Sequence, residues 1–461
     1  MTDIFAKAPR QYTHPLVFLL LIIPFGAASG FLTVTVVYLL GKAGVSPTAS
    51  GALVAASFFP HTIKFLYAPL VDLTFKRKQW FITASITSAI GIAALGMIPP
   101  TNAGLALLSL TAILGNFATA LLSMSVESLM VYNTAPQGLG RTAGWFQAGN
   151  LGGSGLGGGL AMEIAERTSH PWLPGVVLAV ICLLTGIAIL FTNEPEPHPF
   201  LDETPDHITN KNTPLVKLRY IVWPAIRQVL RDLWEVASSR TGYLGLVICF
   251  LPIGSGAGAT LFPQFATEWQ VSASDVGLTT GTINGLLSAL GCLVGGYFCD
   301  RMDRKFAYSV FGVILAMCAV FMAWAPHTRI MFYIFVLAYG FITGLCFASF
   351  TAVTLEAIGK GAAATKYSIF ASLSNTPIAY MNLVNGHFYE NYNSIAWLHS
   401  EPSKTYNSNA GLYSDAACGI IGIFVFLLIR AFPKQIGWIL RAIIMPFAWV
   451  YRKFFPAQQV S

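Results

Sequence analysis

The stretch from Leu16 to Leu40 reads LVFLLLIIPFGAASGFLTVTVVYLL and contains no charged residue. A helix needs about 20 apolar residues to cross a bilayer core that is about 30 Å thick, so this stretch is long enough to span a membrane. It is too long for the apolar region of a signal peptide, and we expect it to remain as the first membrane span. A similar run extends from Phe306 to Trp324.

The composition of the 461-residue chain agrees with this reading. Hydrophobic residues make up 55% of the chain and charged residues only 10%, whereas a soluble domain carries roughly 25% charge. An ordinary soluble enzyme is therefore excluded, and the alternating segments of about 10 residues that build outer-membrane barrels are absent from the sequence. All seven cysteines lie in apolar runs without a CxxC pair, so we expect neither a disulfide framework nor a metal site.

Apolar runs of spanning length recur along the whole chain. We predict an all-α membrane protein with twelve transmembrane helices in two pseudo-symmetric six-helix bundles. The spans are expected near residues 16–40, 48–72, 80–98, 104–132, 140–165, 172–192, 243–266, 276–299, 306–325, 329–356, 365–390 and 412–431.

A polar segment divides the chain six spans plus six. We expect an N-terminal bundle over residues 1–192, a cytoplasmic linker with an amphipathic helix over 193–240, a C-terminal bundle over 241–432 and a cytoplasmic amphipathic tail over 433–461. Basic residues alternate with tryptophans in the linker and in the tail, as in helices that lie on a membrane surface. Such a surface makes membrane lipid an expected partner, and a protein partner is the alternative.

The distribution of Lys and Arg predicts the orientation. Of 27 such residues, 22 fall in the termini and in the loops on their side, and four fall in the opposite loops. Basic residues collect in cytoplasmic loops, so both termini are predicted to be cytoplasmic. The net charge of +7 is explained by this bias, and we expect no nucleic acid as a partner.

The two halves share internal spacings. Twelve residues separate a glycine from a glutamate in the fourth and tenth spans, and nine separate a basic residue from an asparagine in the fifth and eleventh. The pairs are Gly115–Glu127 with Gly344–Glu356, and Arg141–Asn150 with Lys366–Asn375. Many transporters are built by such duplication, and their substrate sites lie at the interface of the repeats.

A loop after the eighth span carries a known pattern. The segment 295–305 reads GGYFCDRMDRK and resembles the signature loop of major facilitator transporters, with Asp303 in place of the usual glycine. In the first half, the segment 64–72 reads KFLYAPLVD and resembles a branch with AmpG-type muropeptide permeases, acetyl-CoA transporters and siderophore importers. The segment 362–374, AAATKYSIFASLS, resembles the eleventh-span motif of that branch, with Lys366 where Gln is usual.

The resemblance carries expectations about the gate. Signature-loop Asp and Arg residues hold the inward gate closed in the family, which implies this role for Asp72, Asp300, Arg301 and Arg304. Arg77 follows Asp72 as Arg304 follows Asp300.

Lys64 is the clearest charge inside a predicted span. A charge in the hydrocarbon costs at least about 2.5–3.5 kcal/mol, so it should face a cavity or a partner. His61 lies about one turn earlier on the same helix face. Three readings remain open for Lys64: a pair with a carboxylate that joins two helices, contact with an anionic substrate, or a role in coupling.

Two glutamates occupy matching places near the inner ends of their spans. We expect a cytoplasmic charge network in which Glu127 pairs with Arg141 or Arg77, and Glu356 pairs with Lys366 or Arg304. Proton binding and a static pair are the alternatives. The deeper polar residues either bridge helices or line the substrate path; they are Asn116, Gln147, Asn150 and Asn375. In the glycine-rich run 152–159, small residues should let helices approach closely.

These patterns favour a secondary active transporter that works by alternating access. The resemblance implies proton-coupled import of a polar metabolite, which is muropeptide-like, siderophore-like or acyl-CoA-like and acidic if it meets Lys64. Efflux by the same fold is the alternative, and a membrane-embedded transferase is a remote one, because no catalytic constellation is visible. We expect a monomer in a bacterial inner membrane, with a small-molecule substrate, protons as coupling ion and no cofactor.

Overall fold

The structure is a computed structural model. It describes residues 12–168, 170–194, 231, 234, 236, 239–265, 268–359, 363–390 and 407–431. Every regular element in these ranges is a helix. The predicted tail over 433–461 and all but a few residues of the predicted linker over 193–240 lie outside the described residues.

The first half begins with a nearly continuous helical stretch, in which α1, the π-helix η1 and α2 follow one another. A second region is split into α3, α4 and α5. The remaining helices run through to Phe191. In order they are α1 (Pro15–Gly30), η1 (Phe31–Val36), α2 (Val37–Lys42), α3 (Pro47–Ser57), α4 (Phe59–Thr62), α5 (Lys64–Leu73), α6 (Arg77–Met97), η2 (Asn102–Gly104), α7 (Leu105–Asn133), η3 (Pro136–Gly138), α8 (Leu139–Gly155), η4 (Leu156–Leu160), α9 (Ala161–Arg167), α10 (Leu173–Gly186) and η5 (Ile187–Phe191).

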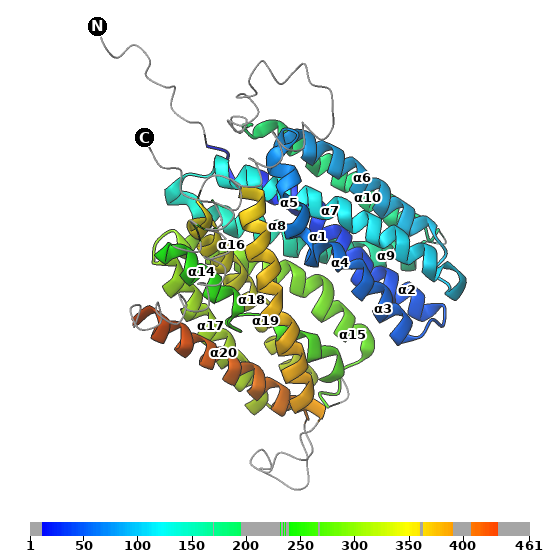
Figure 1. The fold of residues 1–461 in the computed structure, drawn as a ribbon. Coiled ribbons are helices and arrows are strands. Elements are labelled where there is room, and N and C mark those ends of the chain that lie inside the picture. The colour runs from blue at the N-terminus through cyan, green and yellow to red at the C-terminus, as the bar shows by residue number, and fades with distance from the viewer. Residues whose placement is uncertain are drawn as a thin grey trace, which may run out of the picture.

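The second half repeats this organisation with its own interruptions. Its helices are α14 (Arg240–Phe250), η7 (Ala257–Phe265), α15 (Ala273–Leu278), η8 (Thr279–Ile283), α16 (Asn284–Cys299), α17 (Arg304–Trp324), α18 (Arg329–Ile358), α19 (Ala363–Glu390) and α20 (Asn407–Ala431). Figure 1 shows the blue and cyan helices of the first half beside the green to orange helices of the second.

Eight helical stretches in the described ranges are long and apolar enough to cross a membrane. Helices also occupy the other four predicted spans, but these are broken or polar. Pro60 lies in the short helix α4, which separates α3 from α5, and Gly254 and Gly256 adopt positive φ angles between α14 and η7, a conformation that glycine reaches without steric cost. The count of twelve spans therefore remains a prediction.

The outer surface of the bundle is apolar where helices face away from their neighbours. On α6, Ile82, Ile86 and Ile90 are exposed at four-residue spacing, and on α20 Ile420, Phe424 and Leu428 repeat that spacing. Residues four apart share one helix face. These two stripes are therefore suited to contact with lipid chains.

Helix α8 packs against α1 of its own half and against α16 and α18 of the other half. In η4, which continues α8, a Cβ atom added to Gly157 would lie 2.0 Å from the carbonyl oxygen of Ala27 in α1, so only glycine fits there. A Cβ on Gly144 would lie 2.5 Å from the carbonyl oxygen of Cys292 in α16. The expectation that glycines let these helices approach closely is therefore confirmed.

Candidate functional site

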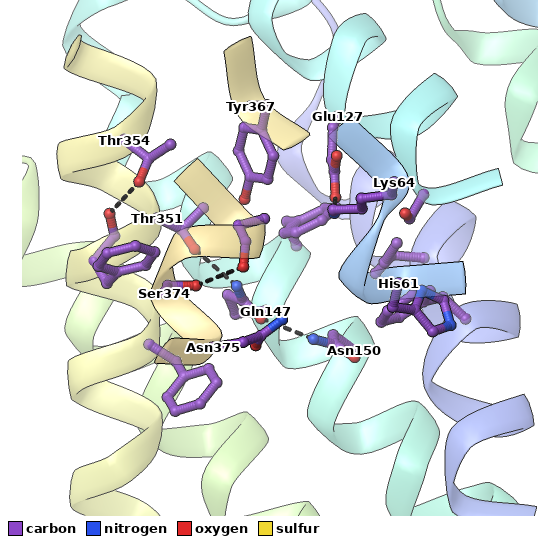
Figure 2. Close-up of a pocket in the computed structure, with 17 residues that line it drawn as sticks. His61, Lys64, Glu127, Gln147, Asn150, Thr351, Thr354, Tyr367, Ser374 and Asn375 are labelled. Carbon is purple, nitrogen blue, oxygen red and sulfur yellow. Dashed lines mark hydrogen bonds and ion pairs between the residues drawn. The ribbon is translucent and has the colours of Figure 1, made fainter. Parts of the chain in front are cut away.

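A cavity of about 200 Å³ lies between the two halves. Helices α1, α4, α5, α7 and α8 contribute its lining from the first half, and α18 and α19 contribute from the second. Figure 2 shows the polar side chains that point into it. Amides, hydroxyls and aromatic rings make up most of the wall, together with one ion pair.

The ion pair joins Lys64 to Glu127. The ammonium nitrogen of Lys64 lies 3.2 Å from Oε1 of Glu127, and the two side chains are only 7% and 5% exposed. Lys64 is the first residue of α5, just after the break at Ile63, while Glu127 lies on α7. The break turns α5 so that Lys64 meets α7 at the cavity wall (Figure 2).

The pairing predicted for Glu127 is wrong, because neither Arg141 nor Arg77 contacts it in the structure. Arg141 binds Asp300, and the Nε of Arg77 donates to the hydroxyl of Ser128. Glu127 lies six residues before the end of α7, about 9 Å along the axis. Lys64 lies about 12 Å along the axis of α5 before Asp72. The two residues are therefore at a similar distance from this end of the bundle, where they can meet.

Two of the predicted amides form a hydrogen-bonded chain across the cavity. The Nε2 of Gln147 on α8 donates to the hydroxyl of Thr351 on α18, at 2.7 Å. The Nδ2 of Asn150 donates to Oε1 of Gln147, at 3.0 Å. Asn375 on α19 also lines the cavity. This chain links the two halves inside the cavity rather than at either end.

Two further predicted residues, His61 and Asn116, contact each other at the edge of the cavity. His61 lines the cavity, and its Nε2 lies 2.9 Å from Oδ1 of Asn116. The Nδ2 of Asn116 bonds the carbonyl oxygen of Ala112 within α7, and Asn116 is not part of the lining. Asn116 thus bridges α7 and α4 through His61, which is one of the two roles that the sequence left open for it.

At one end of the bundle, Asp72 of the first half binds the start of α19 in the second half. Its oxygens accept from the backbone N of Ala364 at 3.1 Å, the backbone N of Thr365 at 2.9 Å and the Thr365 hydroxyl at 2.8 Å. The first N–H groups of a helix lack partners within the helix, and its positive end stabilises an anion. Asp72 therefore joins the two halves at this end.

Asp300 makes the matching contact from the second half. It accepts from the backbone N of Gly140 at 2.7 Å, and from the backbone N and Nε of Arg141 at 3.0 and 2.9 Å. These amides lie at the start of α8. Each half thus supplies one carboxylate to a helix start in the other, as the duplication of the sequence suggests.

The remaining residues that were expected at the gate make contacts of different kinds. Arg304 donates to Glu356 at 3.0 Å and, across the halves, to the carbonyl oxygen of Pro136 at 3.1 Å, while Lys305 reaches the other oxygen of Glu356. Arg301, in the turn that follows α16, stacks on Tyr297 near the end of that helix. The ammonium of Lys366 donates to the carbonyl oxygen of Ile358.

Sequence reasoning missed a buried carboxylate in the last helix. Asp415 accepts hydrogen bonds from the hydroxyl of Tyr339 at 2.7 Å and from the amide of Asn385 at 3.0 Å. These contacts tie α18, α19 and α20 together. An acidic residue three positions inside the predicted span 412–431 was the available signal. The hydroxyl of Thr351 was missed because a threonine in an apolar run carries no distinctive pattern.

A helical bundle of two related halves around a polar cavity is the architecture of a membrane transporter. The sequence profile of the Major Facilitator Superfamily matches residues 17–380. The chain therefore belongs to this superfamily, and it is an integral membrane transport protein.

Curated relatives match at low identity. The anhydromuropeptide permease of Escherichia coli strain K12 is 22% identical over 342 residues, which are 72% of this chain and 65% of that permease. An uncharacterized protein of Haemophilus influenzae is 21% identical over 350 residues, covering 72% of this chain and 78% of that protein. The resemblance to the superfamily and to AmpG-type permeases is thus confirmed, although the match spans less than two thirds of the permease.

Solved structures share the fold. The human organic anion transporter MFSD10 superposes with a TM-score of 0.61 at 15% identity, covering 91% of this chain and 100% of that one. The Escherichia coli fucose:proton symporter gives a TM-score of 0.60 at 14% identity, with 91% and 99% coverage. At this identity the likeness concerns the fold alone.

Proposed function

We propose that this protein imports an acidic muropeptide-like metabolite by proton-coupled alternating access through the cavity between its halves. The observation that carries the proposal is the buried Lys64–Glu127 pair in the cavity wall. Charges inside a membrane protein are expensive, and they mark substrate paths and proton relays. We place substrate binding at His61, Lys64, Gln147, Asn150 and Asn375.

The lining supports a sugar- or peptide-containing substrate. The lining offers amide and hydroxyl groups that suit hydroxyls and peptide bonds; they belong to Gln147, Asn150, Thr351 and Asn375. Phe25 and Phe146 add aromatic surface to the same wall. The printed name of the permease relative adds the muropeptide class to this chemistry.

The gate contacts support an assignment of the conformation. Asp72 and Asp300 join the halves at the end that the Lys and Arg distribution assigns to the cytoplasm. In this assignment the cytoplasmic gate is closed, and both termini are cytoplasmic in a bacterial inner membrane. Reporter fusions after Arg240 and after Pro433 should then report the cytoplasm, and a fusion near Asn407 the opposite side.

Transport in proteoliposomes tests the function. Purified protein should accumulate labelled anhydromuropeptide when the side that faces the predicted periplasmic end is the more acidic, and collapse of the pH gradient should stop accumulation. Absence of uptake at any gradient would contradict the proposal. Net movement only toward the periplasmic side would favour efflux, and chemical conversion of the label would favour the transferase.

A further inference from the structure

The Lys64–Glu127 pair leaves hydrogen-bonding capacity unused on both partners. An ammonium has three donor hydrogens, and the hydrogen bonds recorded among the described residues include one from Lys64, to Oε1 of Glu127. The other oxygen, Oε2 of Glu127, is buried and has no hydrogen bond of good geometry from the described part of the chain, although the hydroxyl of Ser123 one turn earlier is close enough to interact with this carboxylate. A buried carboxylate oxygen without a donor is unfavourable. A new partner for Lys64 or a proton on Glu127 would therefore improve the hydrogen bonding of this pair.

The charged groups nearest Glu127 come from several helices. His61 lies on α4, and Lys64 and Asp72 lie on α5. Arg77 of α6 contacts Ser128, the neighbour of Glu127, and Lys366 lies in the first turn of α19. Tyr67 and Tyr367 are close enough to interact electrostatically with Glu127. Helices α1 and α3, which also pack on α7, carry no charged residue. Among the described residues that line the cavity, Lys64 is the only lysine or arginine, and His61 is the other side chain that can carry a positive charge.

An acidic ligand would need the same cation. If its acid group docked on Lys64 while Glu127 stayed ionised, two anions would share one ammonium inside a cavity of low dielectric, where like charges repel strongly. Protonation of Glu127 removes this repulsion. The carboxyl group then keeps a donor hydrogen for its own neighbours, and all of Lys64 is available to the ligand.

We infer that Lys64 and Glu127 form an exchange pair in which an acidic ligand and one proton bind together. This inference rests on the proposed function and gives its coupling mechanism. The empty site holds one positive and one negative charge. In the loaded site, the proton from solution is bonded to a Glu127 oxygen, and the ligand's acid group supplies the negative charge, so the net charge of the site is unchanged.

A test without ligand uses infrared spectroscopy of the purified full-length protein. In Lys64→Met, Glu127 loses its cation, and the carbonyl stretch of a protonated carboxyl should appear at neutral pH and vanish in Lys64→Met with Glu127→Gln. The matched control combines Lys64→Met with Glu356→Gln, which changes the equivalent glutamate of the other half. In this double variant the carbonyl band should remain. An ionised Glu127 in Lys64→Met would overturn the exchange pair.

A second test adds anhydromuropeptide to weakly buffered protein with a pH-sensitive dye. The wild type should take up close to one proton per bound molecule, whereas Glu127→Gln should bind with no uptake. Lys64→Met should weaken binding roughly 10- to 100-fold. Equal proton uptake by wild type and Glu127→Gln would overturn the inference. If the muropeptide does not bind at all, the proposed substrate is wrong, and the infrared result alone decides the exchange pair.

Discussion

The carboxylate of Asp72 accepts two hydrogen bonds from Thr365, one from the backbone N at 2.9 Å and one from the hydroxyl at 2.8 Å, although 293 residues separate the two along the chain. Asp72 thereby acts as a capping residue for a helix that belongs to the other half. A cap of this kind contributes typically about 1 kcal/mol. The contact is therefore strong enough to bias one arrangement of the halves and weak enough to be released during transport.

We expect Asp72→Asn and Asp300→Asn each to shift the population toward the arrangement that is open at this end. A loss of about 1 kcal/mol corresponds to a roughly fivefold change in the equilibrium. Transport should slow more than binding weakens, because neither residue lies in the cavity. Uptake rates and ligand affinity measured on the same preparations check this.

Asp303→Asn is the matched control for both variants. Asp303 lies in the same loop as Asp300, but its contacts stay within its own half. It accepts a hydrogen bond from the backbone N of Phe306 at the start of α17 and forms an ion pair with Arg430. A loss of affinity with normal exchange rates in Asp300→Asn would contradict the gate assignment.

Lys64→Ala should lower the melting temperature of the detergent-solubilised protein. Removing one partner of a buried pair leaves an unpaired charge, which costs up to about 3–5 kcal/mol before the carboxylate takes up a proton. The double change with Glu127→Gln should recover much of the loss, because no charge then remains to be buried. The control Lys42→Ala, at an exposed lysine, should have little effect on the melting temperature. If the double variant is no more stable than Lys64→Ala alone, Lys64 and Glu127 are not energetically coupled.

Asp415→Ala should destabilise the second half. The hydroxyl of Tyr339 and the amide of Asn385 would both lose their acceptor, and each buried unsatisfied group costs about 1–3 kcal/mol. Asp415→Asn should cost less, since its oxygen still accepts one bond. Thermal unfolding of the two variants, beside exposed Ile420→Ala, measures the difference. Equal melting temperatures for all three would contradict a structural role.

Gly144→Ala should impair folding or transport. The new Cβ would lie 2.5 Å from the carbonyl oxygen of Cys292, and overpacking typically costs about 1–3 kcal/mol. On the same helix, a Cβ at Gly152 would meet only the Cβ of Ala289 at 3.4 Å, so Gly152→Ala should be tolerated. Expression of folded protein and uptake by both variants check this, and similar behaviour of the two would contradict the close packing.

The segment 295–305 indicated the superfamily by its resemblance to the signature loop. Apolar run length predicted the positions of the helices, because it is a local property of the chain. Internal spacing also placed Asn150 and Asn375 in equivalent positions, and both line the cavity. The partner of Glu127 could not be predicted in this way. It depends on the packing of α5 against α7, which brings together two residues that are 63 positions apart in the chain.

Other features depend on packing between distant segments. Asn116 and Gln147 look alike in sequence, as polar residues within apolar runs, yet only Gln147 reaches the cavity. The orientation of each side chain depends on which helix neighbours it, and residue spacing within one helix does not contain that information. The same holds for the bond from Gln147 to Thr351, whose partners are 204 residues apart.

The glycines along α8 have one more consequence. Gly144 meets Gly296 and Gly155 meets Gly285 backbone to backbone, so few side chains cross the line along which α8 and α16 touch. A smooth contact of this kind lets two rigid bodies tilt against each other about an axis that crosses the contact line near its middle. Such a tilt would separate Asp72 from Thr365 at one end while drawing the opposite ends together. Opening at one membrane face and closure at the other would then be a single motion, and no separate signal would be needed to keep the two gates from opening together.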